Sequence, residues 1–446
     1  MKQLYKKIVS ILFISLIGLS AQAQKTLDYS FVTVGCNRVD DVDSTANKPS
    51  TANVYQLNRM FTEVSQLSPL PKYLFFTGDL VIGYAKDTVR LATQLKAWVD
   101  LYKAHPLSST SVKLVVIPGN HETQDKAAGK LSFIAAERTF IREMSEFILG
   151  NNGPKITGLV SGSDSLTTDQ SKLSYSFNYK TDHFVILNTD PVGRDWKVPT
   201  NWIDADITAA KANGARHTFV FGHKPAYACS LKPTDGLVFK NKALRDVFWN
   251  TLETNNCEAM FAAHNHLWEK QQPHANKTWQ IIAGNGGSNL ETGTARVDRY
   301  FGYTLVNVFT NGEIVVESYG RDLDATNYIT QTPTNSTTLR FSQNINLTPI
   351  ATDALQRNKS SNNVITVTPN PMVENAVVKI HIIEAGDVKI DFYDTQGKSV
   401  YSVLDTKLTA GSYEYQLNTS SMNAGTYNVV MVINGKRISK KVVVMK

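Results

Sequence analysis

Four polar segments of the sequence each follow a short apolar run. Gly78-Asp79 comes after Tyr73–Phe76, Asn120-His121-Glu122 after Lys113–Ile117, His223 after Thr218–Phe221, and His264-Asn265-His266 after Ala259–Ala262. Together they offer a carboxylate, an amide oxygen, several imidazoles and an adjacent His-Glu pair. Imidazole suits zinc and iron, and carboxylate oxygen suits manganese as well. These residue types therefore indicate a centre for transition-metal ions.

Each segment alone also has a purely structural interpretation. A Gly-Asp or Gly-His pair after a strand is more often a turn than a pair with a ligand. His264 and His266 carry more weight, because alternate residues of a strand point to one face. Four such segments in chain order make a chemical site the stronger interpretation.

The segments need elements that bring them together. From Tyr29 to about Tyr319, short β-rich runs alternate with helical stretches at 52–66, 89–104, 133–149 and 244–253. The runs that we expect to be strands are 31–34, 73–76, 113–117, 183–187, 218–221, 259–262, 279–283, 302–309 and 313–318. Several are continuously apolar, as in strands covered on both faces. The sequence predicts an α/β domain with some antiparallel sheet, whose site lies beyond the carboxyl ends of its strands.

The order Gly-Asp, Gly-Asn-His-Glu, Gly-His, His-x-His resembles that of the calcineurin-like metallophosphoesterases, which include the purple acid phosphatases. The resemblance covers about Phe31 to Tyr319. It implies a layered α/β sandwich that hydrolyses phosphate esters with a metal-activated water. The implied cofactor is a pair of divalent or trivalent ions, which could be zinc, iron or manganese.

The resemblance also implies a role for each matching residue. Asp79 would bridge two metal ions, while Asn120, His223 and His264 would complete one site and His266 would belong to the other. His121 would be the proton donor or oxyanion stabiliser, and Glu122 would orient its ring. Histidine suits this work because its unperturbed pKa is about 6.5.

The first loop departs from the family pattern. The family normally has Asp directly after the first strand, often with His two residues on, where this chain has Cys36 and Arg38. The site with His266 is therefore short of ligands. Cys36 as a thiolate, Asn37 or Asp40 could replace the missing ligand, and a thiolate would favour zinc. Alternatively, Arg38 could occupy the space of one metal and bind a phosphoryl oxygen, leaving a single ion.

These departures leave alternatives to a phosphomonoesterase. The chain could be a catalytically inactive surface module that binds phosphorylated ligands in the same cleft. Within the enzyme class, a phosphodiesterase or nucleotidase is also open. The expected partner is a phosphorylated small molecule in each case.

Residues 1–23 read as an export signal. Lys2, Lys6 and Lys7 precede the apolar run 8–19, and Ala21-Gln22-Ala23 supplies a cleavage pattern. Without these three lysines, the formal charge of +7 falls to about +4. This charge is too small to indicate nucleic-acid binding, so we expect contact with a nucleic acid only if it is a substrate. A chain with 42% hydrophobic residues is not disordered throughout.

The three cysteines, Cys36, Cys229 and Cys257, cannot all pair within one chain. In an oxidising compartment, one disulfide and one free thiol is the simplest arrangement. Cys229–Cys257 is the preferred pair.

The composition changes after the α/β domain, which we expect to span residues 24–325. Residues 326–363 are rich in Thr, Asn, Ser and Gln and predict a linker. Residues 364–446 contain short strands separated by turn signals, including Asn434-Gly435, and predict a small all-β sandwich. A carbohydrate- or matrix-binding module is the rival interpretation of this tail, which has few aromatic residues for stacking on a sugar.

The tail resembles the C-terminal sorting domain of the type IX secretion system. The matching features are Pro369-Asn370-Pro371, Ile390–Asp394, Gly397-Lys398, Ala424–Tyr427 and Lys440–Val444. The resemblance implies contact with the outer-membrane secretion machinery, and a protein that is secreted or held at the cell surface.

Overall fold

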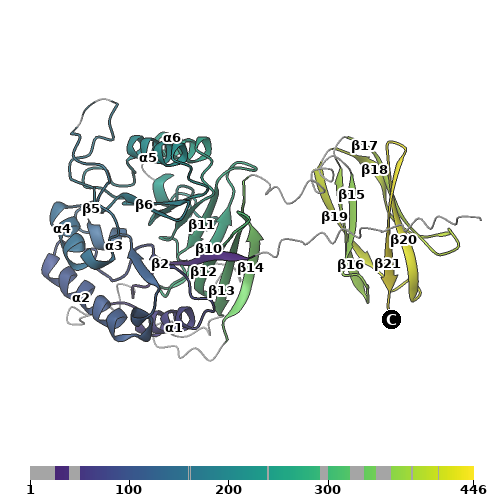
Figure 1. Cartoon of the computed structure of the whole chain (residues 1–446), viewed down its shortest axis with the longest axis horizontal. Helices are drawn as coiled ribbons and strands as arrows, with labels where there is room; N and C mark the ends of the chain where they lie inside the picture. Colours follow the sequence, from purple (N-terminus) through teal and green to yellow (C-terminus); the bar gives the residue numbers. More distant parts are fainter. Residues whose placement is uncertain are drawn as a thin grey trace, which may run out of the picture. The chain divides into compact units, whose positions relative to one another are not determined.

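The computed structural model describes residues 26–39, 51–158, 160, 162–238, 241–291, 300–321, 336–347, 363–382, 385–409 and 411–446. The chain forms two compact units, Met1–Pro349 and Ile350–Lys446 (Figure 1). The predicted signal peptide, Asp40 and most of the predicted linker lie outside the described residues.

Two six-stranded sheets form the centre of the first unit. In order, the first sheet contains β14 (Thr338–Asn344), β13 (Ile314–Arg321), β12 (Phe301–Phe309), β1 (Leu27–Val34), β2 (Tyr73–Phe76) and β3 (Lys113–Val116). The second contains β10 (Trp268–Gln271), β11 (Trp279–Ala283), β9 (Ala259–Ala262), β8 (Thr218–Gly222), β7 (Asp182–Leu187) and β6 (Tyr175–Tyr179). Strands β1, β2 and β3 run parallel, as do β7, β8, β9 and β11. The parallel strands of each sheet therefore end at the same edge.

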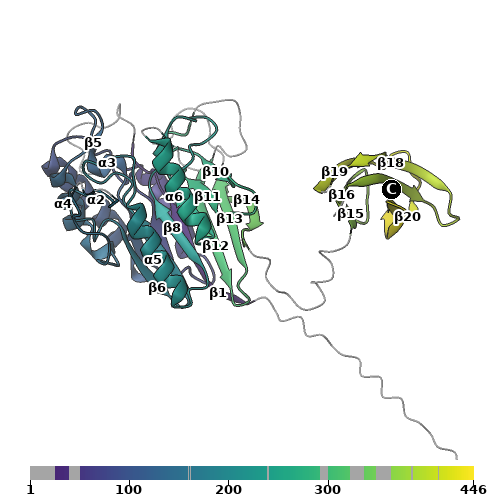
Figure 2. The ribbon, with the colours of Figure 1, turned by 90° about the horizontal axis from the view of Figure 1, so that it is seen from above.

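Helices cover the outer face of each sheet (Figure 2). The first sheet packs against α1 (Val54–Ser65), α2 (Thr88–Ala104) and α4 (Ile134–Glu143), and the second against α5 (Thr200–Ala212) and α6 (Lys242–Thr254). The shorter elements are α3 (Asn120–Thr123), β4 (Gln124–Asp125), β5 (Leu131–Ser132) and the 3₁₀ turns η1 (Pro106–Ser109), η2 (Ser145–Phe147) and η3 (Gly236–Val238). Helix α2 begins after Asp87, whose carboxylate accepts hydrogen bonds from two backbone N–H groups of the first turn.

Alternate residues of the central strands pack into different cores. In β1, Phe31 packs between the two sheets, whereas Val32 packs under the helices of the first sheet. In β8, Phe219 and Phe221 lie between the sheets and Val220 lies under α5 and α6. Burial on both faces explains the continuously apolar sequences. The predicted layered α/β sandwich is confirmed.

The elements differ from the prediction in a few places. The prediction missed α5, β6, β10 and β14. Strand β14 lies inside the predicted linker, which is therefore wrong over 338–344. It pairs with β13 at the sheet edge, and Phe341 packs on Trp268. Only two apolar residues, Leu339 and Phe341, mark this strand, so its polar composition concealed it.

The predicted Cys229–Cys257 disulfide is also wrong, because all three cysteines are free and buried. Cys229 packs with Leu267 and Ile282, while Cys257 lies in the separate core under α5 and α6. These two thiols therefore have separate apolar surroundings, where each packs as a small apolar side chain.

The second unit is the small β-sandwich that the sequence predicts. One sheet contains β15 (Val364–Thr368), β16 (Asn375–Ile382) and β19 (Gly411–Asn418). The other contains β18 (Ser399–Leu408), β17 (Gly386–Tyr393), β20 (Gly425–Ile433) and β21 (Lys436–Val444). Ile380, Phe392 and Val429 are among the buried residues of their common core. Among the described residues, no helix has the length and apolarity required to cross a membrane.

Candidate functional site

The four polar segments meet at the carboxyl ends of four strands, β2 and β3 of the first sheet and β8 and β9 of the second. The Oδ1 atom of Asn120 lies 3.0 Å from Nε2 of His223 and 3.0 Å from Nδ1 of His264. His223 Nε2 is 3.1 Å from Oδ1 of Asp79. We call Asp79, Asn120, His223 and His264 site A. Two oxygen and two nitrogen donors converge there.

Partners outside site A fix its two imidazole rings. Nδ1 of His223 donates to the carbonyl of Thr77 at 2.8 Å, and Nε2 of His264 contacts Oδ1 of Asp235 at 2.9 Å. Each ring therefore has its other nitrogen facing Asn120. This is the arrangement by which proteins orient metal-binding histidines.

A second group of donor atoms shares Asp79. The thiol of Cys36, the carboxylate of Asp79 and the imidazole of His266 each place a donor atom within 4.8 Å of the others. We call these three residues site B. His266 Nδ1 donates to the carbonyl of Asn289 at 2.8 Å, which leaves its Nε2 available.

The remaining residues of the first loop lie beside site B. Nε of Arg38 is 3.5 Å from Oδ2 of Asp79, and its Nη1 donates to the carbonyl of Val39. The amide nitrogen of the Asn37 side chain donates to the carbonyls of Gly286 and Asn53. Asn37 therefore ties its loop to the chain after β11. Asp40 lies outside the described residues.

His121 and Glu122 are both buried next to Asp79. The His121 ring is held by the carbonyl of Ile82, 2.5 Å from its Nδ1, and its Nε2 is 3.9 Å from Oδ2 of Asp79. The carboxylate of Glu122 instead accepts four backbone N–H groups, those of Gly119, Asp79, Leu80 and Val81. The expectation that Glu122 orients the His121 ring is therefore wrong, because the carboxylate is occupied by backbone N–H groups of the loops after β2 and β3.

Three site residues have an unusual backbone conformation. Cys36, Asp79 and His264 have φ angles of 57°, 55° and 65°, in the left-handed region that side chains seldom adopt. Such conformations cost about 1–3 kcal/mol each and cluster at functional sites. Gly119 permits the accompanying close approach, because a Cβ atom there would lie 2.4 Å from the backbone nitrogen of Asp79.

Burial and charge shift the pKa values of the site. Burial raises the pKa of Asp79, but the charges of His223 and His121 hold it well below its usual value. Burial and the Arg38 charge lower the pKa of His121 to about 3 and that of His266 well below its usual value. Burial opposes a charged His223, but the Asp79 carboxylate raises its pKa overall. Without bound metal, His121 and His266 are therefore neutral near pH 7.

The residues that orient the ligands were not predicted from the sequence. Thr77 and Asn289 act through backbone carbonyls, for which no residue type is diagnostic. Asp235 does act through its side chain, but it lies in a loop without a motif, far along the chain from His264.

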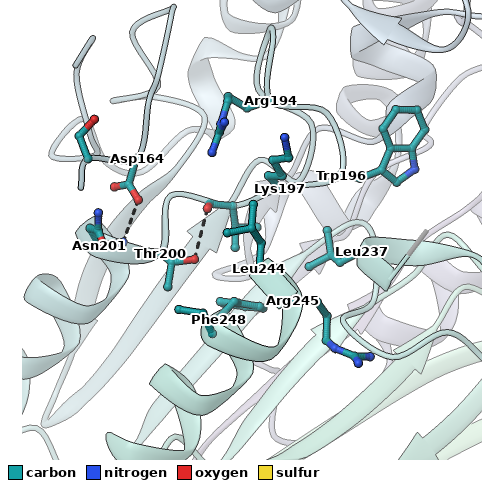
Figure 3. A pocket seen from close by; sticks show the side chains of 13 residues that line it. Asp164, Arg194, Trp196, Lys197, Thr200, Asn201, Leu237, Leu244, Arg245 and Phe248 are labelled. Carbon is teal, nitrogen blue, oxygen red and sulfur yellow. Dashed lines mark hydrogen bonds between the residues drawn. The ribbon is translucent and has the colours of Figure 1, made fainter. Parts of the chain in front are cut away.

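A cavity of about 100 Å³ has no residue of sites A and B in its lining, and Figure 3 shows the side chains that line it. Trp196, Leu237 and Phe248 line it together with the cationic side chains of Arg194 and Arg245. Ligand pockets usually enclose at least about 300 Å³. This cavity is therefore small for a substrate.

The donor set fits metal ions. Site A offers imidazole nitrogens with carboxylate and amide oxygens, which suit zinc, iron or manganese. The rings of both sites are held through the nitrogen that is not needed for binding.

Two segments of the chain match known families. Residues 50–268 match the family described as calcineurin-like phosphoesterase, and residues 366–445 match the secretion system C-terminal sorting domain. No curated protein matches the chain in sequence.

Several solved structures are similar at low identity. A purple acid phosphatase from yellow lupin (Lupinus luteus) is 15% identical, with a TM-score of 0.47, over 66% of this chain and 51% of that chain. GAP50, the anchor in the inner membrane complex of Plasmodium, is 13% identical, with a TM-score of 0.44, over 74% and 93% of the two chains. PorU from Porphyromonas gingivalis is 18% identical over 32% of this chain and 13% of that chain, with a TM-score of 0.17. This chain thus spans about half the length of the lupin phosphatase.

Proposed function

We propose that the chain hydrolyses phosphate esters outside the cell, with site A at the centre of the reaction, because residues 50–268 match the calcineurin-like phosphoesterase family. The sorting domain over residues 366–445 directs the chain to type IX secretion, and so to the cell surface or the medium. The finer proposals are that the sorting domain binds the outer-membrane secretion machinery and that the substrate is a small phosphomonoester.

The observation that carries the proposal is the convergence at site A. Nε2 of His223 lies 3.0 Å from Oδ1 of Asn120 and 3.1 Å from Oδ1 of Asp79. Nδ1 of His264 lies 3.0 Å from the same Asn120 oxygen. A metal ion held there would lower the pKa of a bound water and polarise the phosphoryl group. Asp79 is shared with site B, so it is the residue that would bridge a second ion.

His121 and Arg38 are the proposed contacts to the substrate. Because Nδ1 of His121 donates to the Ile82 carbonyl, only Nε2 can exchange a proton with the leaving oxygen. Burial and Arg38 keep the ring neutral in the free protein. The negative charge of an incoming phosphate ester would favour protonation of His121 at Nε2. The ring would then pass this proton to the leaving oxygen. The Arg38 guanidinium lies beside Asp79, where it could bind a phosphoryl oxygen.

The test is hydrolysis of p-nitrophenyl phosphate beside its bis ester, with metal-loaded and metal-free protein. We expect metal-dependent release of p-nitrophenol, and a His121→Gln variant that binds metal normally but turns over about 10²- to 10⁴-fold more slowly. Faster cleavage of the bis ester would instead indicate a diesterase. Protein that binds metal and phosphate but turns over neither ester would be the catalytically inactive binding module, and the hydrolase proposal would be wrong.

A further inference from the structure

We propose that Cys36 is a thiolate ligand, and that site B is a metal site made of sulfur, oxygen and nitrogen from Cys36, Asp79 and His266. The inference deepens the proposed function, on which it rests, because site B shares Asp79 with site A. It assigns site B to a thiophilic ion, of which zinc and iron are the biological examples, rather than to manganese.

The positions of the donor atoms carry the first step. The three donors lie within 4.8 Å of one another. Metal–sulfur and metal–nitrogen bonds of about 2.3 and 2.1 Å in a tetrahedral site place those donors about 3.6 Å apart. A small contraction around an ion therefore brings all three into its coordination sphere. Three protein ligands with one open position is the pattern of catalytic zinc sites.

The surroundings of the three thiols give an internal comparison. Cys257 lies in the core under α5 and α6, and Cys229 packs against Leu267 and Ile282. The thiol of Cys36 instead faces Asp79 and His266. Its sulfur also accepts the backbone N–H of His264 at 3.1 Å, which favours a thiolate. Burial and the Asp79 charge hold the pKa of the metal-free thiol well above its usual value, so the bound cation itself has to stabilise the thiolate.

The backbone of Cys36 gives the second step. Its φ angle of 57° costs free energy that glycine would not incur. A left-handed cysteine that only filled space would have no compensating role. A role as a ligand explains why a side chain stands at this position at all.

Arg38 is the rival occupant of the same space, since a guanidinium could replace the second cation. Its geometry does not favour this role. Nε of Arg38 is 3.5 Å from Asp79, beyond the 2.7–2.9 Å of a charge-assisted hydrogen bond, and Nη1 is directed to the Val39 carbonyl. Arg38 therefore forms a long ion pair with Asp79, but its Nε makes no short hydrogen bond to the carboxylate of site B.

Cobalt(II) is the probe, because a cobalt–thiolate bond gives a charge-transfer absorption in the near ultraviolet. The full chain is stripped of metal, reconstituted with Co²⁺, and measured by absorption and by mass-spectrometric metal analysis. We expect two cobalt ions per chain and a charge-transfer band. A Cys36→Asp variant should retain two ions and lose the band, because its carboxylate is an oxygen ligand.

A Cys229→Ala/Cys257→Ala variant is the matched control, since it leaves Cys36 as the only thiol and should keep the band. Because Cys36 is its only thiol, a band in this variant identifies Cys36 as the ligand even if Cys36→Asp fails to fold. One ion per chain without a band would overturn the inference and give the second charge to Arg38. Ester hydrolysis separates the two proposals. Turnover without a charge-transfer band would contradict only the proposal that Cys36 is a thiolate ligand. Two ions and a band without turnover would contradict only the proposal that the chain is a hydrolase.

Discussion

Site A and site B share one carboxylate but differ in how their remaining donors are supplied. In site A, Asn120, His223 and His264 come from the ends of three strands and match a recurring motif order. In site B, Cys36 comes from a loop that departs from that order, and a cation, Arg38, stands beside it. If both sites hold metal ions as proposed, one half of a shared centre keeps its motif residues while the other half has a different donor chemistry.

The two sites also differ in how tightly they are closed. Each His of site A has a ring nitrogen within 3.2 Å of another site A donor atom. The donor atoms of site B are spread more widely, over up to 4.8 Å from one another. Site A is therefore preorganised, and site B requires contraction around its ion. We expect site A to bind its metal more tightly.

The largest expected effect comes from the residue that both sites share. In Asp79→Asn, the side chain keeps an oxygen that can accept the His121 backbone N–H, but loses the bridging charge. We expect turnover to fall at least about 10³-fold, since both ions lose a ligand. Metal content and p-nitrophenyl phosphate hydrolysis check this, with circular dichroism as the control for folding. An active, metal-replete variant would show that Asp79 bridges nothing.

Removing one imidazole from each site in turn should show that the two sites bind metal separately. His264→Ala is expected to lose the site A ion and keep the cobalt–thiolate band, and His266→Ala to weaken site B instead. Each should lower turnover by more than the 10- to 100-fold that follows loss of a mere orienting partner. Identical metal content and spectra for the two variants would contradict the division into sites.

A smaller effect is expected from Asp235, which holds the His264 ring through Nε2. Asp235→Ala should weaken metal binding at site A about 10- to 100-fold and leave the thiolate band of site B unchanged. Asp100→Ala, at an exposed position of α2, is the matched control. Competition with a chelator measures the affinity. Equal losses at both sites would mean that the variant disturbs the fold rather than one ring.

The smallest effect is on the stability of the metal-free protein. Burial lowers the pKa of His121 to about 3 and lowers the pKa of His264 and His266. Below pH about 6.5 the unfolded chain binds protons that these folded residues do not. The contribution of these three residues to the free energy of unfolding should therefore fall with falling pH, by at most about 1.4 kcal/mol per pH unit and group. His223 and Glu122, whose pKa values are raised, contribute in the opposite direction.

Thermal unfolding in a chelator between pH 8 and pH 5 measures this trend. His121→Gln should flatten the pH dependence because it removes one contributing group. A pH dependence that His121→Gln leaves unchanged would contradict the assignment of a neutral, buried His121 ring.

Sequence patterns predict the parts of this molecule that depend on local chemistry. The apolar runs of β1, β2 and β8 predict buried strands because both of their faces are covered. The order of polar segments predicts which residues meet at site A. Strand β14 was not predictable in this way, since its pairing with β13 rather than its composition makes it a strand.

The contacts that orient the site depend on tertiary structure alone. Asp235 reaches His264 across the fold, and Glu122 binds backbone N–H groups some forty residues earlier in the chain. Neither spacing follows a local period. The thiol of Cys36 is suggested by the missing motif residue, but only the fold brings it to Asp79 and His266.

The left-handed backbone of Cys36, Asp79 and His264 has an evolutionary consequence. Glycine would adopt the same conformation without strain, so replacing any of the three by glycine should relieve local strain while removing a ligand. Selection for stability and selection for chemistry therefore oppose each other at these positions. If the proposed metal centre is correct, relatives without the reaction are expected to carry glycine at these positions more often than relatives that keep it.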